Sequence, residues 1–159
     1  MHVRRPRDFP KDLRNPVSGL SDNKDRPNRE RRMTRRESRR EIGERGEKMA
    51  REYLIDRGWT VLETNFRTKQ GEIDIIAIRD DRTPGPTVAF VEVKTRSGSI
   101  EAKASVTAAK RKQIVRMAKI YIHRHPCDLA VLRFDVIAID LPRQIEHYEG
   151  AFDALGRPF

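Results

Sequence analysis

The chain has 159 residues, with 34 Lys and Arg against 24 Asp and Glu, a formal net charge of +10 and a single cysteine. One cysteine excludes an intramolecular disulfide, and the length suits a single domain with its own core. No apolar run approaches the ~20 residues of a membrane-spanning helix, and none follows the basic N-terminus as in a secretory signal, so we expect a cytoplasmic protein.

Residues 1–40 lack hydrophobic periodicity. They hold 14 Lys and Arg and 6 Asp and Glu, a net charge of +8, which leaves +2 for the rest of the chain. We expect a basic tail that is disordered when free and that attracts nucleic-acid phosphates. Alternative readings are a solubilising extension, an arm that contacts the ribosome, and sequence upstream of a start at Met33. Candidate phosphate contacts in the tail are Arg35, Arg36, Arg39 and Arg40.

Residues 43–58 predict an amphipathic helix that ends at Gly58. Its buried stripe includes Ala50 and Leu54, and Glu47 falls close to that stripe. An acid that faces inward suits a functional site. An equally good reading is that Glu47 lies near the start of the helix, where the macrodipole favours an acid.

Residues 59–65 predict a strand, and two more apolar runs follow at 71–78 and 90–94. The segment between these two runs is dense in turn formers, which predicts an antiparallel hairpin with its midpoint near Thr83.

Charged side chains interrupt both runs of this hairpin. A register symmetric about its midpoint sets Asp74 opposite Glu92, and Glu72 opposite Lys94. Apolar neighbours on both faces imply strands that are covered on both sides, where an uncompensated carboxylate is costly. A divalent cation is the simplest compensation, and we favour it. The alternative is a set of ion pairs, Glu72 with Lys94 and Asp74 with an arginine.

From residue 105 to about 123, apolar positions recur at helical spacing among lysines and arginines, which predicts a helix with a basic outer face. Residues 129–140 predict another buried strand, and 144–148 a short edge strand. The His and Cys residues of 123–128 span a helix end and a proline turn, which is poor geometry for a closed zinc site. We read that segment as a surface helix terminus.

Five short motifs carry a family resemblance. They are Gly43-x-x-Gly46-Glu47-x-x-Ala50, Asn65-Phe66-Arg67, Gly71-Glu72-Ile73-Asp74, Phe90-Val91-Glu92-Val93-Lys94-Thr95-Arg96 and Arg133-Phe134-Asp135-Val136. With them the chain resembles the YraN-type family of predicted endonucleases over roughly residues 43–140. The resemblance implies the restriction-endonuclease-like fold of the PD-(D/E)xK superfamily, which archaeal Holliday-junction resolvases share.

This fold is α/β, with a core of order α-β-β-β-α-β and a mixed central sheet flanked by helices. We therefore expect a nuclease-like domain at 41–150 and a C-terminal extension at 151–159. Carried over to this chain, the family's catalytic site falls on Glu47, Asp74, Glu92 and Lys94.

The expected cofactor is Mg²⁺ or Mn²⁺, because hard cations prefer oxygen ligands. Asp74, Glu92 and the carbonyl of Val93 are the candidate ligands, and Glu47 would hold a second ion or an outer-shell water. Lys94 would position the attacking water or stabilise the developing charge.

Further candidates are less specific. Related nucleases place polar groups of the second helix near the scissile phosphate, although an exposed basic helix face is an equally good reading here. The nucleic-acid candidates outside the tail are Arg96, Lys110, Arg111 and Gln113. Asp135 and Glu72 are second-choice acids, each with an ion pair as its alternative.

The sequence thus predicts a metal-dependent endonuclease that acts on nucleic acid, with DNA in repair or recombination as the first choice. Analogy with resolvases favours a homodimer. One alternative is a non-catalytic nucleic-acid-binding module that retains the nuclease fold. Another is a structural role for the acids, with a tail that recruits a protein partner.

Overall fold

The computed structural model describes residues 38–81, 85–96, 106–127, 130–141 and 144–158. The predicted α/β class and the core order α-β-β-β-α-β are confirmed, with one further strand at the end. The elements are α1 (Arg39–Asp56), β1 (Thr60–Thr68), β2 (Gly71–Asp80), β3 (Pro86–Arg96), α2 (Ala108–Arg124), β4 (Val131–Asp140) and β5 (Gln144–Phe152).

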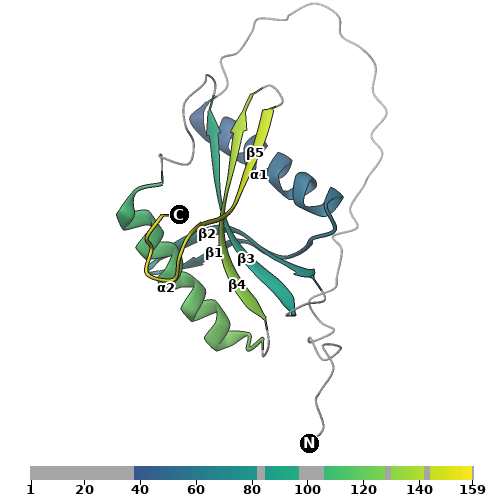
Figure 1. The fold of residues 1–159 in the computed structure, drawn as a ribbon. Coiled ribbons are helices and arrows are strands. Elements are labelled where there is room, and N and C mark those ends of the chain that lie inside the picture. The colour runs from purple at the N-terminus through teal and green to yellow at the C-terminus, as the bar shows by residue number, and fades with distance from the viewer. Residues whose placement is uncertain (1–37, 82–84, 97–105, 128–129, 142–143, 159) are drawn as a thin grey trace, which may run out of the picture. The chain divides into compact units, whose positions relative to one another are not determined.

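The strands of the described residues form one sheet in the order β1-β2-β3-β4-β5 (Figure 1). Neighbouring strands are antiparallel except β3 and β4, which are parallel. Parallel strands need a long crossover, and α2 supplies it between β3 and β4. The mixed sheet is as predicted.

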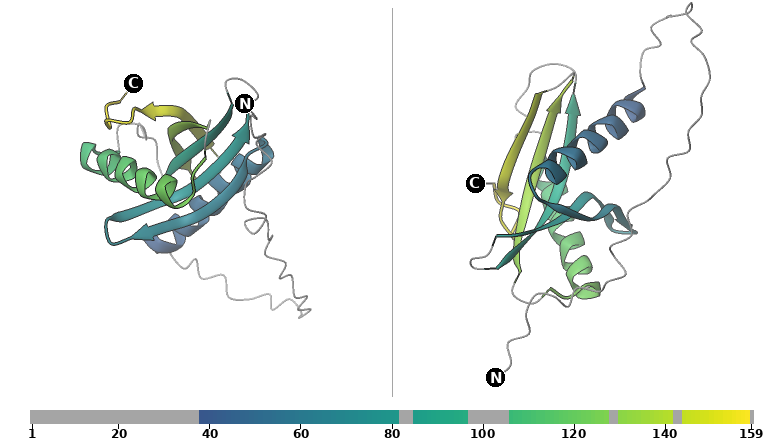
Figure 2. Two further views of the ribbon diagram at one scale, coloured as in Figure 1. Left: turned by 90° about the horizontal axis from the view of Figure 1, so that it is seen from below. Right: turned by 90° about the vertical axis from the view of Figure 1, so that its right-hand side faces the viewer.

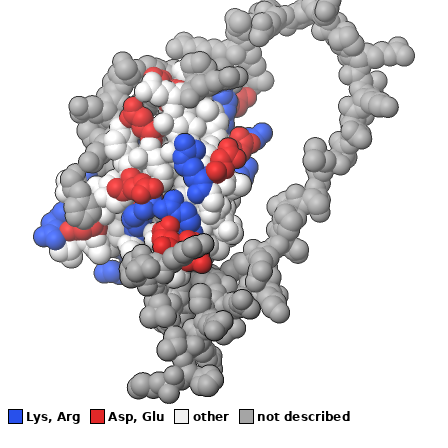
Figure 3. Space-filling model, turned by 45° about the vertical axis from the view of Figure 1, so that its right-hand side comes forward, with Lys and Arg blue, Asp and Glu red and all other residues white. Residues whose placement is uncertain are grey.

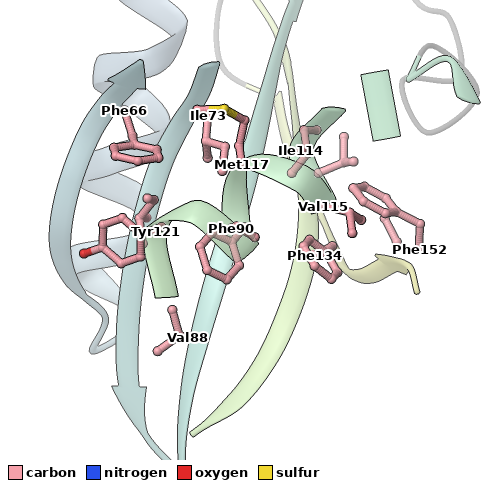
Figure 4. Close-up of a cluster of buried hydrophobic side chains, with 14 of the residues drawn as sticks. Phe66, Ile73, Val88, Phe90, Ile114, Val115, Met117, Tyr121, Phe134 and Phe152 are labelled. Atoms are coloured by element: carbon pink, nitrogen blue, oxygen red, sulfur yellow. The ribbon is translucent and has the colours of Figure 1, made fainter. Parts of the chain in front are cut away.

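The two helices lie on opposite faces of the sheet, so the domain has three layers (Figure 2). Successive side chains of a strand alternate between faces, which explains why β2, β3 and β4 are apolar on both. On one face α1 packs Ala50 and Leu54 against the sheet. On the other face Met117 and Tyr121 of α2 meet a cluster of aromatic residues that includes Phe90 (Figure 4).

The first helix begins at Arg39, four residues before the predicted start at 43. Ser38 forms a capping box with Glu41: Ser38 Oγ accepts a hydrogen bond from the Glu41 amide at 3.2 Å, and the Ser38 amide donates to Glu41 Oε2 at 2.7 Å. Such a cap stabilises the first turn by about 1 kcal/mol. Arg39 and Arg40 therefore belong to α1 and not to the tail. The rest of the predicted tail lies outside the described residues.

The last strand is longer than the predicted 144–148, because it continues to Phe152. Ala151 and Phe152 are buried, and Phe152 stacks on Phe134 with ring centroids 5.3 Å apart. The predicted boundary between residues 150 and 151 thus falls inside β5.

Figure 3 shows a face on which Lys and Arg lie beside Asp and Glu. This mixture agrees with the small net charge that the sequence leaves for residues beyond 40. Neither helix in the described part of the chain is long and apolar enough to cross a membrane.

Candidate active site

The strands β2 and β3 separate at one end, and the predicted acids lie where they part. The ladder between them follows the predicted register as far as the pair Ile75–Val91. It ends one residue before Asp74 and Glu92 would face each other. Instead, Asp74 Oδ2 accepts a hydrogen bond from the Val93 amide at 2.7 Å. The amide and carbonyl of a strand residue point to the same side, so the carbonyl of Val93 also faces this gap.

Two irregularities in β1 accompany the separation. The register with β2 shifts between Val61 and Glu63, and Asn65 has a φ of 54°, in the left-handed region that asparagine tolerates. Bulges of this kind bend a strand and increase its twist. At the end of β1, Thr68 Oγ1 donates a hydrogen bond to Met117 Sδ of α2 at 3.2 Å. The turn end of the β1–β2 hairpin therefore packs against α2 and is not paired with β3.

Glu92 is buried between two lysines. Its side chain is 3% exposed, Lys94 Nζ donates to its Oε1 at 2.7 Å, and Lys110 Nζ of α2 lies 3.1 Å from its Oε2. The contact with Lys110 is an ion pair without hydrogen-bond geometry, so within the described residues Oε2 has no hydrogen-bond partner. Most buried acceptors receive a well-formed hydrogen bond, so an oxygen whose contact is the ion pair with Lys110 is a candidate ligand atom.

The pKa of Asp74 is raised to about 7. Burial is the largest cause, followed by the negative charge of Glu92, and Glu47 adds a smaller contribution of the same sign. The hydrogen bond from the Val93 amide and the charge of Lys110 act in the opposite direction. A shift caused by burial and a specific like charge is typical of functional sites. It is also a shift that a bound cation would reverse.

Glu47 reaches this end of the sheet from the opposite face. Gly46 allows α1 to approach β3 closely, because a Cβ at Gly46 would lie only 1.7 Å from Thr95 Oγ1. Asn65 Nδ2 donates a hydrogen bond to Glu47 Oε2 at 3.1 Å. Asn65 lies between Thr64 and Phe66, whose partners Ile75 and Ile73 flank Asp74 on β2, so this hydrogen bond brings α1 close to the acids.

The carboxylates do not form a complete metal-ligand set. Among the described residues, no three His, Cys, Asp or Glu side chains come together closely enough to hold a metal ion. The candidate ligands that remain are Asp74, Glu92 and the carbonyl of Val93, and direct ligation by Glu47 finds no support here. This partial set still suits Mg²⁺, which commonly takes one or two carboxylates and completes its shell with water and substrate phosphates.

The acid Glu72 lies outside this cluster. The register predicted it opposite Lys94, but the β2–β3 ladder ends before either residue. Instead Glu72 pairs with Arg67 of β1, with Arg67 Nε 3.0 Å from Glu72 Oε2.

Asp135 is a buried acid of a different kind. It accepts hydrogen bonds from Arg133 to both of its oxygens at 2.9 Å, from His147 Nε2 at 2.8 Å and from the Gly150 amide at 2.9 Å. Burial acts to raise its pKa, but these hydrogen bonds outweigh burial and the pKa is lowered. Asp135 therefore links β4 to β5, as its ion-pair alternative predicted.

The nucleic-acid candidates divide into three groups. Lys110 lies at the acids, and Gln113 lies against the turn between β1 and β2. Arg111 is taken up by the fold, because its Nε donates to the Gly156 carbonyl at 2.8 Å and its Nη1 to the Val106 carbonyl at 2.5 Å. The remaining candidates are Arg39 and Arg40 in the first turn of α1, Arg96 at the end of β3, and Arg35 and Arg36 outside the described residues.

Sequence reasoning gave no role to Asn65 or Arg67, although both lie near the acids. Arg67 Nη2 donates to Asn65 Oδ1 at 3.3 Å, so the two side chains join Glu47 to Glu72. The signal was present in the motif Asn65-Phe66-Arg67, but the positive φ of Asn65 is visible only in three dimensions.

Comparison with solved structures adds no argument. SfsA of Pyrococcus furiosus in complex with Ca²⁺ matches with a TM-score of 0.22 and 10% identity, over 69% of this chain and 62% of that chain. A TM-score this low supports neither a fold nor a function.

Comparison of sequences places the chain in a family. The uncharacterised protein family UPF0102 matches residues 46–139, the region that contains the acids and both lysines. The UPF0102 protein of Alkalilimnicola ehrlichii is 43% identical over 121 residues, covering 73% of this chain and 90% of that protein. The UPF0102 protein of Thermodesulfovibrio yellowstonii is 42% identical over 114 residues, covering 70% of this chain and 96% of that protein. The chain belongs to the uncharacterised protein family UPF0102.

Proposed function

We propose that this protein is a divalent-metal-dependent endonuclease that hydrolyses phosphodiester bonds of nucleic acid. The substrate that we favour is DNA, in repair or recombination. The observation that carries the proposal is the group of two carboxylates, buried Glu92 and half-buried Asp74, with two lysines where β2 leaves β3. Asp74 has a pKa of about 7, and Glu92 beside it keeps an oxygen without a hydrogen bond among the described residues. Resemblance to the YraN-type family supports the same activity.

The reaction dictates the roles of these residues. Attack on a phosphodiester meets negative oxygens, so a catalyst must supply positive charge and orient a water molecule. Mg²⁺ or Mn²⁺ bound by Asp74, Glu92 and the Val93 carbonyl would supply that charge and lower the pKa of a bound water. The ammonium groups of Lys94 and Lys110 lie close enough to Glu92 to contact a phosphate that approaches it.

The two lysines have different expected roles. Lys94 lies two residues after Glu92 on β3 and would orient the attacking water, since its protonated ammonium donates hydrogen bonds and cannot act as a base. Lys110 comes from α2 and would bind a phosphate oxygen. Glu47, held by Asn65, would orient a water at the edge of the cluster.

One observation favours a second function, that of a non-catalytic nucleic-acid-binding module. Lys94 and Lys110 already neutralise Glu92 without a cation, and the described residues bring no third acid to it. In that case the lysines bind phosphates and the acids only hold the lysines in place.

A cleavage assay with the full chain tests the endonuclease. Linear, nicked, flap and four-way-junction DNA, and RNA of the same sequences, would be incubated with Mg²⁺ or Mn²⁺. We expect Asp74→Asn or Glu92→Gln to lower the cleavage rate by on the order of 100-fold or more, because each removes a ligand and a charge from the transition state. Asp56→Asn, at the exposed end of α1, is the matched control and should cleave like the wild type.

Metal titration separates the two functions. Mn²⁺ should raise the midpoint of thermal unfolding of the wild type, and Asp74→Asn should abolish this gain. Cleavage that persists in the double variant Asp74→Asn/Glu92→Gln would reveal a contaminant or a different site. Salt-sensitive DNA binding without any metal effect would instead identify the accessory module.

A further inference from the structure

A second feature adjoins the acids: a pocket of about 400 Å³ between the β1–β2 turn and α2. Its size lies within the range of small-ligand sites. It is lined by Arg67, Thr68, Lys69, Gln70, Gly71, Glu72, Lys110 and Gln113. We call it the hairpin pocket.

The position of the hairpin pocket depends on Gly71. This residue follows the two-residue turn between β1 and β2 and has a φ of 144°, a conformation that favours glycine. A Cβ at Gly71 would lie 2.4 Å from the side chain of Gln113, so glycine lets the turn close against α2. Thr68 holds the turn from within, because its Oγ1 accepts a hydrogen bond from the Gln70 amide at 3.0 Å. The pocket is thus built by residues that fix the turn on the helix.

The lining of the hairpin pocket suits an anion. Arg67, Lys69 and Lys110 bring three positive charges to the lining and Glu72 brings one negative charge, while Lys110 also pairs with Glu92 at the edge of the pocket. Glu72 pairs with Arg67, whereas Lys69 has no ion-pair partner among the described residues. The side-chain amides of Gln70 and Gln113 complete the lining and can donate hydrogen bonds, whereas the Thr68 hydroxyl already donates to Met117.

The lining also shows what the hairpin pocket would not recognise. None of its residues is aromatic, so a base has no ring in it to stack on. Lysine and arginine bind phosphate oxygens without regard to base sequence. The chemistry therefore fits the phosphate of a nucleic-acid backbone and not a nucleobase.

Lys110 connects the hairpin pocket to the acids. Its Nζ lies 3.1 Å from Glu92 Oε2 and donates to the backbone carbonyl of Glu72 at 3.4 Å. One ammonium group thus borders both sites. A strand whose phosphate occupies the pocket would present a neighbouring phosphodiester to Asp74 and Glu92.

We propose that the hairpin pocket binds a backbone phosphate of a nucleic-acid strand, without base preference, and thereby presents a neighbouring phosphodiester to the acids. The location of the cleaved bond rests on the proposed endonuclease function. Phosphate binding in the pocket is independent of that function, because it needs no metal and no cleavage.

The test is equilibrium binding of labelled single-stranded and duplex DNA, and of RNA, to the full chain with a chelator present. Fluorescence anisotropy would be measured at several salt concentrations. Lys69→Gln should weaken the binding of every base sequence by a similar factor and reduce the slope of log K against log salt by about 1. Lys69→Arg should restore affinity, because the charge is kept.

Glu72→Gln gives a change of opposite sign. It removes the single acid of the lining and releases Arg67 from its ion pair, so affinity should rise and the salt slope should steepen by about 1. Lys119→Gln, an exposed lysine on α2 outside the hairpin pocket, is the control and should bind like the wild type. A merely structural role for the turn predicts weaker binding in both pocket variants.

The results separate the failure of this inference from the failure of the endonuclease. If Lys69→Gln and Glu72→Gln bind nucleic acid like the wild type, the inference that the hairpin pocket binds phosphate is wrong, even in a protein that cleaves. A loss confined to one base sequence would also overturn it. If the two variants shift affinity in opposite directions in a protein that cleaves nothing, phosphate binding by the pocket is supported. The protein is then a nucleic-acid-binding accessory module and not an endonuclease.

Discussion

Two aspartates show how little burial alone says about an acid. Asp74 and Asp135 both lie in central strands, yet the pKa of Asp74 is raised to about 7 and that of Asp135 is lowered. The difference lies in their partners. Asp135 receives hydrogen bonds from Arg133, His147 and an amide, whereas the neighbours of Asp74 include the like charge of Glu92. Protein groups compensate the charge of Asp135 fully and that of Asp74 only in part, which is why Asp74 is the acid that we propose as a ligand.

The raised pKa of Asp74 makes the metal-free protein less stable at high pH. The folded state holds a proton on Asp74 up to about pH 7, but the unfolded state releases it near pH 4, so the free energy of unfolding falls as pH rises through this window. With a chelator present, Asp74→Asn should therefore be more stable than the wild type at about pH 8, by roughly 2 kcal/mol, and equal to it near pH 4. Denaturant unfolding at several pH values measures this difference.

Asp135→Asn should change the free energy of unfolding in the opposite direction. A lowered pKa stabilises the folded state above about pH 4, and this stabilisation is lost as pH falls further. The substitution should cost about 3 kcal/mol at neutral pH, because Arg133 loses its buried partner. Equal effects of the two substitutions would show that Asp74 is as well compensated as Asp135.

The sequence predicted which helices and strands form better than it predicted the residues at which they begin, end or stop pairing. Two apolar runs and the turn formers between them were enough to place β2 against β3 in the right register about Thr83. The point where this ladder stops was not predictable, because it depends on the contact between Thr68 and Met117 and on the left-handed Asn65. That stopping point decides that Asp74 receives the Val93 amide and does not pair with Glu92.

The close approach of α1 to β3 makes a prediction for two glycines of one helix. At Gly46 a Cβ would clash with Thr95, whereas at Gly43 it would meet nothing within 4 Å. Gly46→Ala should therefore lower the free energy of unfolding by about 2 kcal/mol, because the helix must shift away from the strand. Gly43→Ala should raise it by about 0.5–1 kcal/mol through helix propensity alone.

Chemical denaturation measures both glycine variants. Gly46→Ala should also lower any cleavage activity, since Glu47 moves with its helix, and Gly43→Ala should leave activity intact. Equal stability of the two variants would contradict the close packing of α1 on Thr95.

On the scale of the whole molecule, charge and candidate site lie in different parts of the chain. Residues 1–40 carry +8 of the net +10, and the face in Figure 3 mixes both signs among the described residues. Composition alone located this charge, and the motifs located the acids. Neither located the hairpin pocket, because its cations come from the end of β1, the turn after it and α2, some forty residues apart in the chain, and meet only through the packing of the turn on the helix.

This separation predicts that general affinity and local placement of nucleic acid can be altered independently. Each cation that contacts a phosphate adds about 0.9 to the slope of log K against log salt for duplex DNA. Replacing four tail arginines by glutamine should therefore lower the slope by up to about 3 to 4 and weaken binding at low salt most. The four are Arg31, Arg32, Arg35 and Arg36. Cleavage positions on a labelled junction should stay the same, because the hairpin pocket and the acids are unchanged.

The control is the double variant Lys48→Gln/Lys119→Gln, which changes two exposed lysines outside the tail and the pocket. An unchanged slope in the tail variant would move the electrostatic contact onto the folded domain, where Lys69 and Lys110 would have to supply it.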